Sequence, residues 1–307
     1  MKLKSLNSRF RNWLALPGGV GIFSGIVMIF ILVLLGFFVP LLKVRSDAFV
    51  GEPFAPPSFK YPFGLDQLGR DMFVRVFDAV WIDLGVAFLG VSIPLIIGTI
   101  VGILLGLARN RYFVSVMGSI IDGVNAFPLL IIAVAALTFL GPGLKSVVII
   151  LSLTNWARYA RISRTKAVVV VQQNYIEAAK TLGYSKWRTI RKHIAPNVSS
   201  ESIAYALSDF ILVITVVAGL SFLGLAARPP MAEWGSMIAD GRIFLGQAWW
   251  LVIFPGLALC WAACRSPSLS KPFTSRSRGL NVHTSVGLHR RVKNRCTTHS
   301  FQSIAYR

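Results

Sequence analysis

Apolar stretches of roughly membrane-spanning length alternate with polar segments along most of the chain. The hydrocarbon core of a bilayer is about 30 Å thick, and a helix needs roughly 20 apolar residues to cross it. Six stretches approach that length, at about 20–42, 81–108, 113–140, 143–163, 202–226 and 249–264. The pattern predicts an all-α polytopic membrane protein with six transmembrane helices, in a transmembrane domain that covers residues 20–264.

The fourth and sixth stretches are the weakest. Only 12 uncharged residues separate Lys145 from Arg158, so we expect Arg158 and Arg161 to extend toward the membrane surface. The sixth stretch offers about 16 apolar residues between Trp249 and Arg265, which make about 24 Å of helix.

Composition supports a membrane protein, because only 14% of the residues are charged and the mean hydropathy is +0.64. The net charge of +20 would also suit a nucleic-acid partner. Lysine and arginine, however, gather in alternate segments: the N-terminus (1–19), the loop at 109–111, the loop after the fourth stretch, and the tail. This alternation predicts a multi-pass membrane protein with both termini cytoplasmic, and no nucleic-acid partner.

The basic loop at 166–198 contains sequence signals for the starts and ends of two short helices. "NYIEAAKTLG" (174–183) is rich in helix formers and ends in Gly183, which suits a helix C′ position. Ser185 can cap a following helix, which is expected to continue until Pro196 stops it. The loop therefore reads as a cytoplasmic helix-turn-helix.

Two interpretations of this loop are open on physical grounds. Small Ala178 and Ala179 permit close approach of another backbone, and Trp187 and Ile190 give the second helix an apolar face among cations. That shape suits docking into a groove of a cytoplasmic partner. A basic loop that binds anionic membrane lipid is the alternative.

The run "EAAKTLG…IAP" resembles the EAA loop of ABC importer permeases, which docks on the ATP-binding subunit and transmits its movement. Ala195 replaces the leucine usual in the family. The resemblance implies a type I ABC importer permease-like fold. The ATPase-coupling residues that we expect are Glu177, Ala178, Ala179, Gly183, Trp187, Arg188, Ile194 and Pro196.

Four further segments are similar to the dipeptide, oligopeptide and nickel branch of that family. They are "YPFGLDQLGRDMFVR" (61–75), "DGVNAFPLL" (122–130), "LSFLGLAARPPMAEWGSMIADGR" (220–242) and "WWLVIFPGLAL" (249–259). The chain departs from the family at Trp81 and Asp83, which replace an arginine and a serine, and at 218–219, where the usual glutamate is absent. These departures concern substrate specificity more than fold.

Polar residues inside the predicted spans are candidates for a translocation path. They are Asp122, Asn125 and Asp209, with Asn155 as a further polar position. Charges at membrane depth are costly and normally face the bundle interior or a water-filled path. Lining the path and bridging two helices are equally compatible with the sequence.

Glycine and proline predict local geometry in the spans. Gly98, Gly102 and Gly106 form a ladder on one face of the second span, which favours close packing against another helix. Pro128 is a candidate kink in the third span.

A charged group precedes the second span and faces outward in this topology. Asp66, Arg70, Asp71 and Arg75 suit contact with an extracytoplasmic solute-binding protein, and they suit an internal ion-pair network equally well.

Motifs for catalysis are missing from the sequence. It has no G-x-x-x-x-G-K-[ST] phosphate loop, no H-E-x-x-H, no Gly-x-Ser-x-Gly and no Cys/His ligand cluster. We therefore expect no enzyme activity, metal or cofactor in this chain, and the resemblance implies that partner subunits bind ATP.

The tail at 265–307 differs from the rest, with nine basic residues and no acid. We expect it to be disordered, and we hypothesise a frame-shifted C-terminus, because residue usage changes inside a predicted helix. A basic arm for lipid or nucleic acid is the alternative.

The resemblance implies a permease subunit that moves small solutes, di- or oligopeptides first among them, into the cytoplasm by ATP-driven alternating access. Its implied partners are two ATP-binding subunits, a second homologous permease and an extracytoplasmic solute-binding protein. The alternatives are an ion-driven secondary transporter and a non-functional permease remnant with an aberrant C-terminus.

Overall fold

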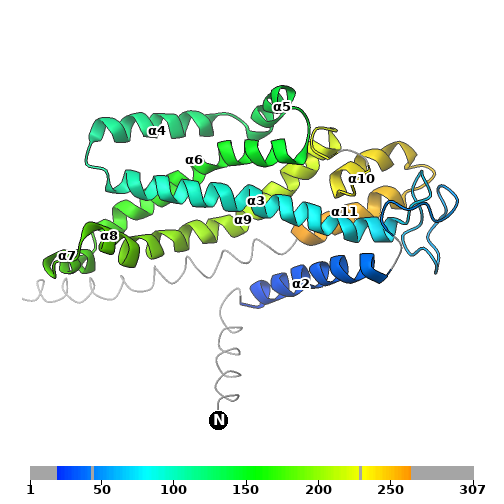
Figure 1. Ribbon diagram of the computed structural model, residues 1–307, viewed down its shortest axis with the longest axis horizontal. Coiled ribbons are helices and arrows are strands. Elements are labelled where there is room, and N and C mark those ends of the chain that lie inside the picture. The colour runs from blue at the N-terminus through cyan, green and yellow to red at the C-terminus, as the bar shows by residue number, and fades with distance from the viewer. Residues whose placement is uncertain (1–18, 43–44, 228–229, 264–307) are drawn as a thin grey trace, which may run out of the picture.

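The computed structural model describes residues 19–42, 45–227 and 230–263, and these are mostly helical (Figure 1). The predictions for the N-terminus up to residue 18 and for the tail lie outside the described residues. The long elements are α2 (Gly19–Leu42), α3 (Met72–Leu107), α4 (Arg111–Ala126), α5 (Leu129–Leu140), α6 (Leu144–Val171), α9 (Ala195–Phe222) and α11 (Trp250–Ala263). The short ones are α7 (Asn174–Thr181), α8 (Lys186–Thr189), the π-helix η1 (Ile190–Ile194), α10 (Trp234–Gly241) and the 3₁₀ turn η2 (Arg242–Phe244).

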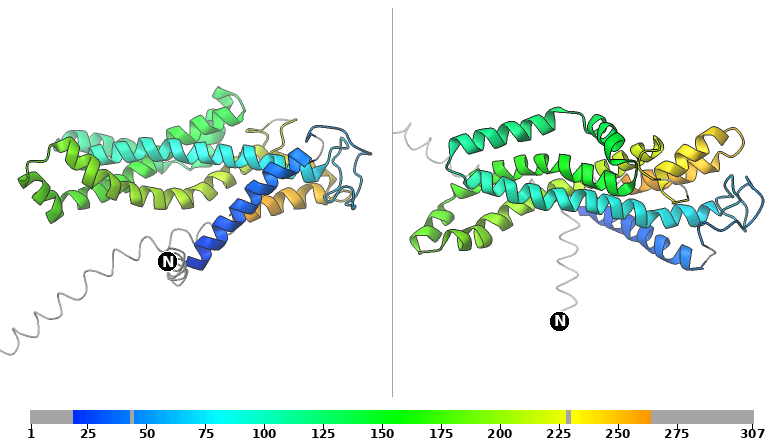
Figure 2. Two further views of the ribbon diagram at one scale, coloured as in Figure 1. Left: turned by 60° about the horizontal axis from the view of Figure 1, so that its bottom comes forward. Right: turned by 45° about the horizontal axis from the view of Figure 1, so that its top comes forward.

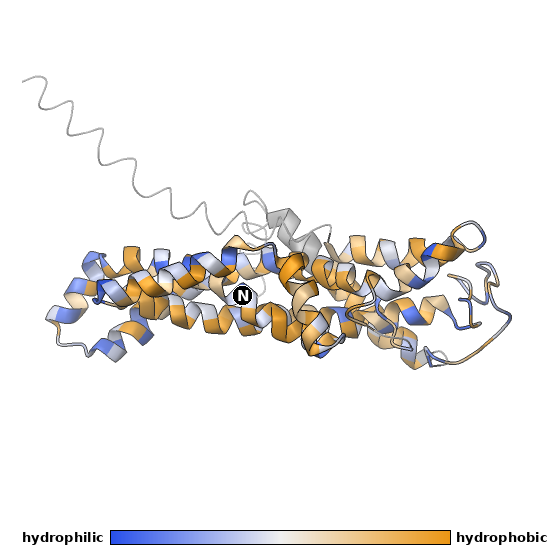
Figure 3. Cartoon of the chain, turned by 90° about the horizontal axis from the view of Figure 1, so that it is seen from above, coloured by the Kyte–Doolittle hydropathy of each residue, from blue (hydrophilic) through white to orange (hydrophobic). Residues whose placement is uncertain are grey.

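The helices form an elongated bundle around α3, which packs mainly against α6 and α9 (Figures 1 and 2). Helix α2 packs against α3, and α4 lies along α6. The ends of the bundle differ: α7 and α8 lie at one end, whereas α10 and the segment 45–71 lie at the other (Figure 1). Hydrophobic residues dominate the helices between these ends (Figure 3).

The glycine ladder on α3 sets the distance between α3 and α6. A Cβ atom at Gly102 would lie 2.5 Å from the carbonyl oxygen of Ala160, and one at Gly106 would lie 2.6 Å from the Cβ of Ala167. Any side chain at these positions would push the helices apart, so the predicted close packing is confirmed.

Two described helices are long and apolar enough to cross a membrane, Met72–Leu107 and Lys186–Phe222. The bent pair α4 and α5 counts as a third if the two helices form one span. Val27–Leu41 and Trp250–Ala263 are shorter apolar helices. Length and composition thus support a multi-pass protein, and the six-span count stays a prediction.

The third predicted span, 113–140, is not one continuous helix. It breaks between Ala126 and Leu129, and α4 and α5 meet at 89°. Phe127, with ψ 137°, is extended because the ring of Pro128 disfavours helical backbone at the preceding residue. The expected kink at Pro128 is therefore a full break.

The expectation that Pro196 ends the loop's second helix is wrong. Helical structure continues from Lys186 through η1 and α9 to Phe222. In η1 the turn widens, and the N–H of Ala195 donates to the carbonyl of Ile190. Pro196 then occupies the first turn of α9, directly after the π turn has interrupted the regular i→i−4 hydrogen bonds that a proline would break.

Candidate functional site

The turn between α7 and α8 has the geometry that the sequence predicts. Gly183 has φ +77°, and its N–H donates to Lys180 O at 3.0 Å. The N–H of Tyr184 donates to Ala179 O at 3.1 Å, which completes a Schellman motif. The Ser185 hydroxyl caps α8 by accepting from the N–H of Arg188 at 3.3 Å.

One side of this loop anchors it to the bundle. Ile176, Ala179 and Ile194 are at most 5% exposed. Ile176 and Ile194 belong to a buried cluster with Ile103 of α3 and Val170 of α6. Of the predicted coupling residues, Ala179 and Ile194 therefore hold the loop in place.

The other coupling residues point away from the bundle. They are all exposed, namely Glu177, Ala178, Gly183, Trp187, Arg188 and Pro196. Trp187 is 71% exposed and lines a surface pocket together with Arg188, Arg191 and Lys192. An exposed aromatic ring among cations suits a groove with acidic edges on a partner.

A second cavity, of about 690 Å³, lies between the loop and the end of α3. Arg109, Lys180 and Lys186 line it, together with apolar Ile176 and Ile194. If the loop binds anionic lipid, this cationic cavity is where the headgroup would fit.

Asp122 pairs with Arg161, which was not among the predicted path residues. Its Oδ1 atom forms an ion pair with Nη2 of Arg161 on α6, and the Asp122 and Arg161 side chains are 70% and 55% exposed. Asn125 donates to the carbonyl of Ile121 in its own helix at 2.8 Å. The exposed face shared by α4 and α6 thus carries the pair.

Asp209 lies elsewhere, in the interior, and is 2% exposed. Its Oδ2 atom accepts from the hydroxyl of Tyr159 at 2.9 Å, which bridges α9 to α6. Ser163 and Ser202 bridge the same two helices at 2.8 Å. The structure therefore does not bring Asp209 together with Asp122 and Asn125.

The charged group before α3 forms an internal network in this chain. Oδ2 of Asp66 lies 2.6 Å from Nε of Arg70 and 3.7 Å from Nε of Arg75. Asp71 caps α3 by accepting from the N–H of Phe73 at 2.9 Å. All four charged side chains belong to residues at most 8% exposed, so this surface offers little of them to a receptor.

The two departures from the family, Trp81 and Asp83, make structural contacts. The indole N–H of Trp81 donates to Gly36 O at 2.9 Å and ties α3 to α2. Oδ2 of Asp83 accepts from the N–H of Trp234 at 3.2 Å, beside buried Glu233, which caps α10. Asp83 stands inside an apolar stretch, and this position was the sequence signal for a contact between α3 and α10.

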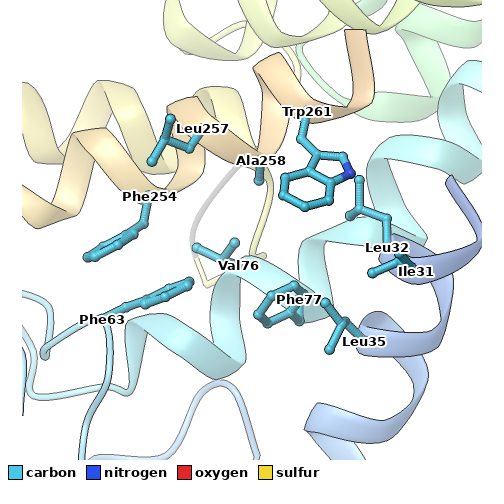
Figure 4. A pocket seen from close by; sticks show the side chains of 10 residues that line it. All are labelled: Ile31, Leu32, Leu35, Phe63, Val76, Phe77, Phe254, Leu257, Ala258 and Trp261. Carbon is cyan, nitrogen blue, oxygen red and sulfur yellow. The ribbon is translucent and has the colours of Figure 1, made fainter. Parts of the chain in front are cut away.

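An apolar pocket of about 250 Å³ lies between α2, α3 and α11 (Figure 4). Phe63, Phe77, Phe254 and Trp261 are among its lining side chains, none of which is charged. A peptide would find few hydrogen-bonding partners there, so this pocket is a poor peptide site. Within the described residues, no group of three or more potential ligands could hold a metal ion.

A helical membrane chain whose loop is anchored on one side and exposed on the other fits the class of transport permeases that work with partner subunits. The chain belongs to the family described as binding-protein-dependent transport system inner membrane component, whose match covers residues 98–263. This confirms the family that the EAA loop indicated. Such a system includes ATP-binding subunits and a substrate-binding protein, and its permease is not a catalytic subunit.

Its relatives include the dipeptide transport system permease protein DppC of Alkalihalophilus pseudofirmus, 35% identical over 237 residues, which are 76% of this chain and 78% of that protein. The di/tripeptide transport system permease protein DppC of Pseudomonas aeruginosa is 31% identical over 255 residues, or 80% and 84% of the two chains. The alternative of an ion-driven secondary transporter is therefore not favoured.

Two solved structures share the fold. One is an inward-facing MetNI methionine ABC transporter, with TM-score 0.53 and 17% identity, covering 66% of this chain and 95% of that one. The other is an amino acid ABC transporter with histidines, with TM-score 0.50 and 20% identity, covering 66% and 93%. At these identities the likeness concerns the fold alone.

Proposed function

We propose that this chain is a permease subunit of an importer that moves di- or oligopeptides into the cytoplasm by ATP-driven alternating access. Its partners are two ATP-binding subunits, a second homologous permease and an extracytoplasmic solute-binding protein. The observation that carries the proposal is the α7–α8 loop, which is anchored on one side and presents Trp187 and Arg188 on the other. The peptide relatives support the choice of substrate.

The distribution of charge along the bundle supports a cytoplasmic position for the loop. Helix α3 ends, α4 begins and α7–α8 lie at one end of the bundle, where Arg109 and Arg111 join the cations of the loop (Figure 1). The opposite end carries 45–71 and α10, where acids outnumber bases. We propose six spans with both termini cytoplasmic, in the inner membrane of a bacterium.

The loop would transmit movement through its packing on α3 and α6 and through its continuation into α9. Its buried residues pack on α3 and α6, and α8 continues through η1 into α9, which reaches α10 near the far end. A displacement of the loop by an ATP-binding subunit would therefore shift α9 against α3. A permease couples the two events only if its contacts differ between inward-open and outward-open states.

We propose that the translocation path runs along the exposed face of α4 and α6, which carries Asp122 and Asn125. The second permease would form the other side of this path. Buried Asp209 and Asn155 would then act on the path only by positioning α6 and α9.

Two loop variants test the proposal in the complete transporter. Gly183→Pro cannot adopt φ +77° and removes the N–H that Lys180 accepts, and Trp187→Glu places an anion on the docking face. We expect uptake of a labelled dipeptide to fall below about a tenth of wild type, as for a lost interface hot spot. Membrane insertion should be unchanged.

Trp187→Phe is the matched control, because it keeps an apolar aromatic ring at the same exposed position and adds no charge. It should retain uptake. Wild-type uptake by both loop variants would overturn the proposed function.

A further inference from the structure

Helix α4 is a surface helix with two chemically different flanks. Ile121 is its only buried residue, and it faces α6. Exposed Ser115, Ser119 and Asp122, at helical spacings of four and three, share one flank, and exposed Phe113, Val116 and Ile120 share the other. A helix surrounded by lipid would not need the polar flank.

The ion pair on that flank lies deep in the bundle. Asp122 is 11 residues after Arg111, the start of α4, and Arg161 is 10 residues before Val171, the end of α6. At about 1.5 Å per residue, both lie roughly 15 Å from the end of the bundle that carries α7 and α8. In the predicted topology Arg161 is two residues before the end of the fourth span, 143–163, and Asp122 is nine residues after the start of the third span, 113–140.

Two charges that lie inside predicted spans and are more than half exposed are unfavourable against lipid tails. The flank must therefore face water or protein. This places the pair on the path proposed above, on which the present inference rests.

The chemistry of the pair matches what peptides have in common. Peptides differ in side chains, but nearly all carry an ammonium group at one end and a carboxylate at the other. A guanidinium binds a carboxylate through two parallel hydrogen bonds, and a carboxylate pairs with an ammonium. The pair is also solvent-exposed, so separating it costs little.

We propose that Arg161 binds the terminal carboxylate, and Asp122 the terminal ammonium, of a peptide in transit. Entry of the peptide breaks one ion pair and forms two, and its departure lets Arg161 and Asp122 pair again. Three extended residues span about 10 Å, so Arg161 and Asp122, which are in contact in the free chain, must turn apart to hold the two ends of a tripeptide.

The test is equilibrium binding to the purified transporter in nanodiscs without the solute-binding protein. The probes are tri-alanine, its C-terminal amide and its N-acetyl form. Wild type should bind tri-alanine about two- to fivefold more tightly than either capped form, since each cap removes one solvent-exposed ion pair. Arg45→Gln, at an exposed ion pair outside the helices, is the control and should keep both preferences.

Each variant should erase one preference only. Arg161→Gln should bind tri-alanine and its amide equally while still discriminating against the N-acetyl form, and Asp122→Asn should do the reverse. Arg161→Lys should keep part of the preference for a free carboxylate.

The inference is overturned if wild type shows no preference or no binding at 10 mM peptide, or if both variants weaken all three peptides equally, as a purely structural pair would. Those results leave the proposed function standing. The proposed function would be overturned by a different result, which is full uptake by both loop variants.

Discussion

The molecule contains two ion-pair sites of the same chemistry in opposite environments. At Asp66–Arg70 the side chains are 3% and 6% exposed, whereas at Asp122–Arg161 they are 70% and 55% exposed. Both join an aspartate to an arginine in a largely apolar chain. The difference teaches that burial, rather than residue type, decides whether such a pair holds the fold or is free to exchange partners.

Both carboxylate oxygens of Asp66 at the buried site have hydrogen-bond partners. Oδ1 of Asp66 accepts from the N–H groups of Leu68 and Arg70, both at 2.9 Å. Arg75 donates to the carbonyls of Ser46 and Pro230, both at 3.4 Å. The network thus ties the segment before α3 to the segment after α9, and no member can leave without stranding another.

The largest effect is expected from Asp66→Ala. It leaves the guanidinium groups of Arg70 and Arg75 buried without their carboxylate, and breaking a buried pair costs about 3–5 kcal/mol. Unfolding of the purified transporter in mixed detergent should report this loss. Asp47→Ala, at the exposed Arg45–Asp47 pair, is the control, with a change below about 1 kcal/mol. Equal losses from the two variants would show that burial is not the deciding factor.

A smaller effect is expected when the support of the exposed pair is changed. Gly102→Leu inserts a side chain where even a Cβ would lie 2.5 Å from Ala160 O, so α6, which carries Arg161, must move away from α3. Overpacking of this kind costs about 1–3 kcal/mol. The same unfolding assay measures it, and peptide uptake should fall as well.

Gly85→Leu is the matched control, since a Cβ at Gly85 of the same helix meets nothing within 4 Å. If both glycine variants were tolerated alike, the close approach of α3 and α6 would not fix the position of Arg161.

The sequence predicted those features that depend on local chemistry. The Schellman turn at Gly183, the cap at Ser185 and the ladder at Gly102 all follow from residue type and spacing. The break before Pro128 was underestimated, and the stop at Pro196 was wrong, because a π turn upstream provides a first-turn position for the proline.

Burial could not be predicted, because it depends on residues distant in sequence. Arg75 meets Pro230 across 155 positions, so the sequence left network and receptor contact equally open for this group. Nothing in the sequence places Arg161 beside Asp122, 39 positions away, so the sequence predicted no partner for this arginine.

The smallest effect on stability is expected at the exposed pair itself. Asp122→Asn and Arg161→Gln should each lower the free energy of unfolding by less than about 1 kcal/mol, because water already solvates both groups. The assay is the one used for Asp66→Ala, so the variants can be ranked directly. A loss at Asp122 as large as the loss at Asp66 would mean that assembly with the second permease buries this pair. Arg161 and Asp122 would then be held together too firmly to separate for a passing peptide, and the contrast between the two sites would disappear.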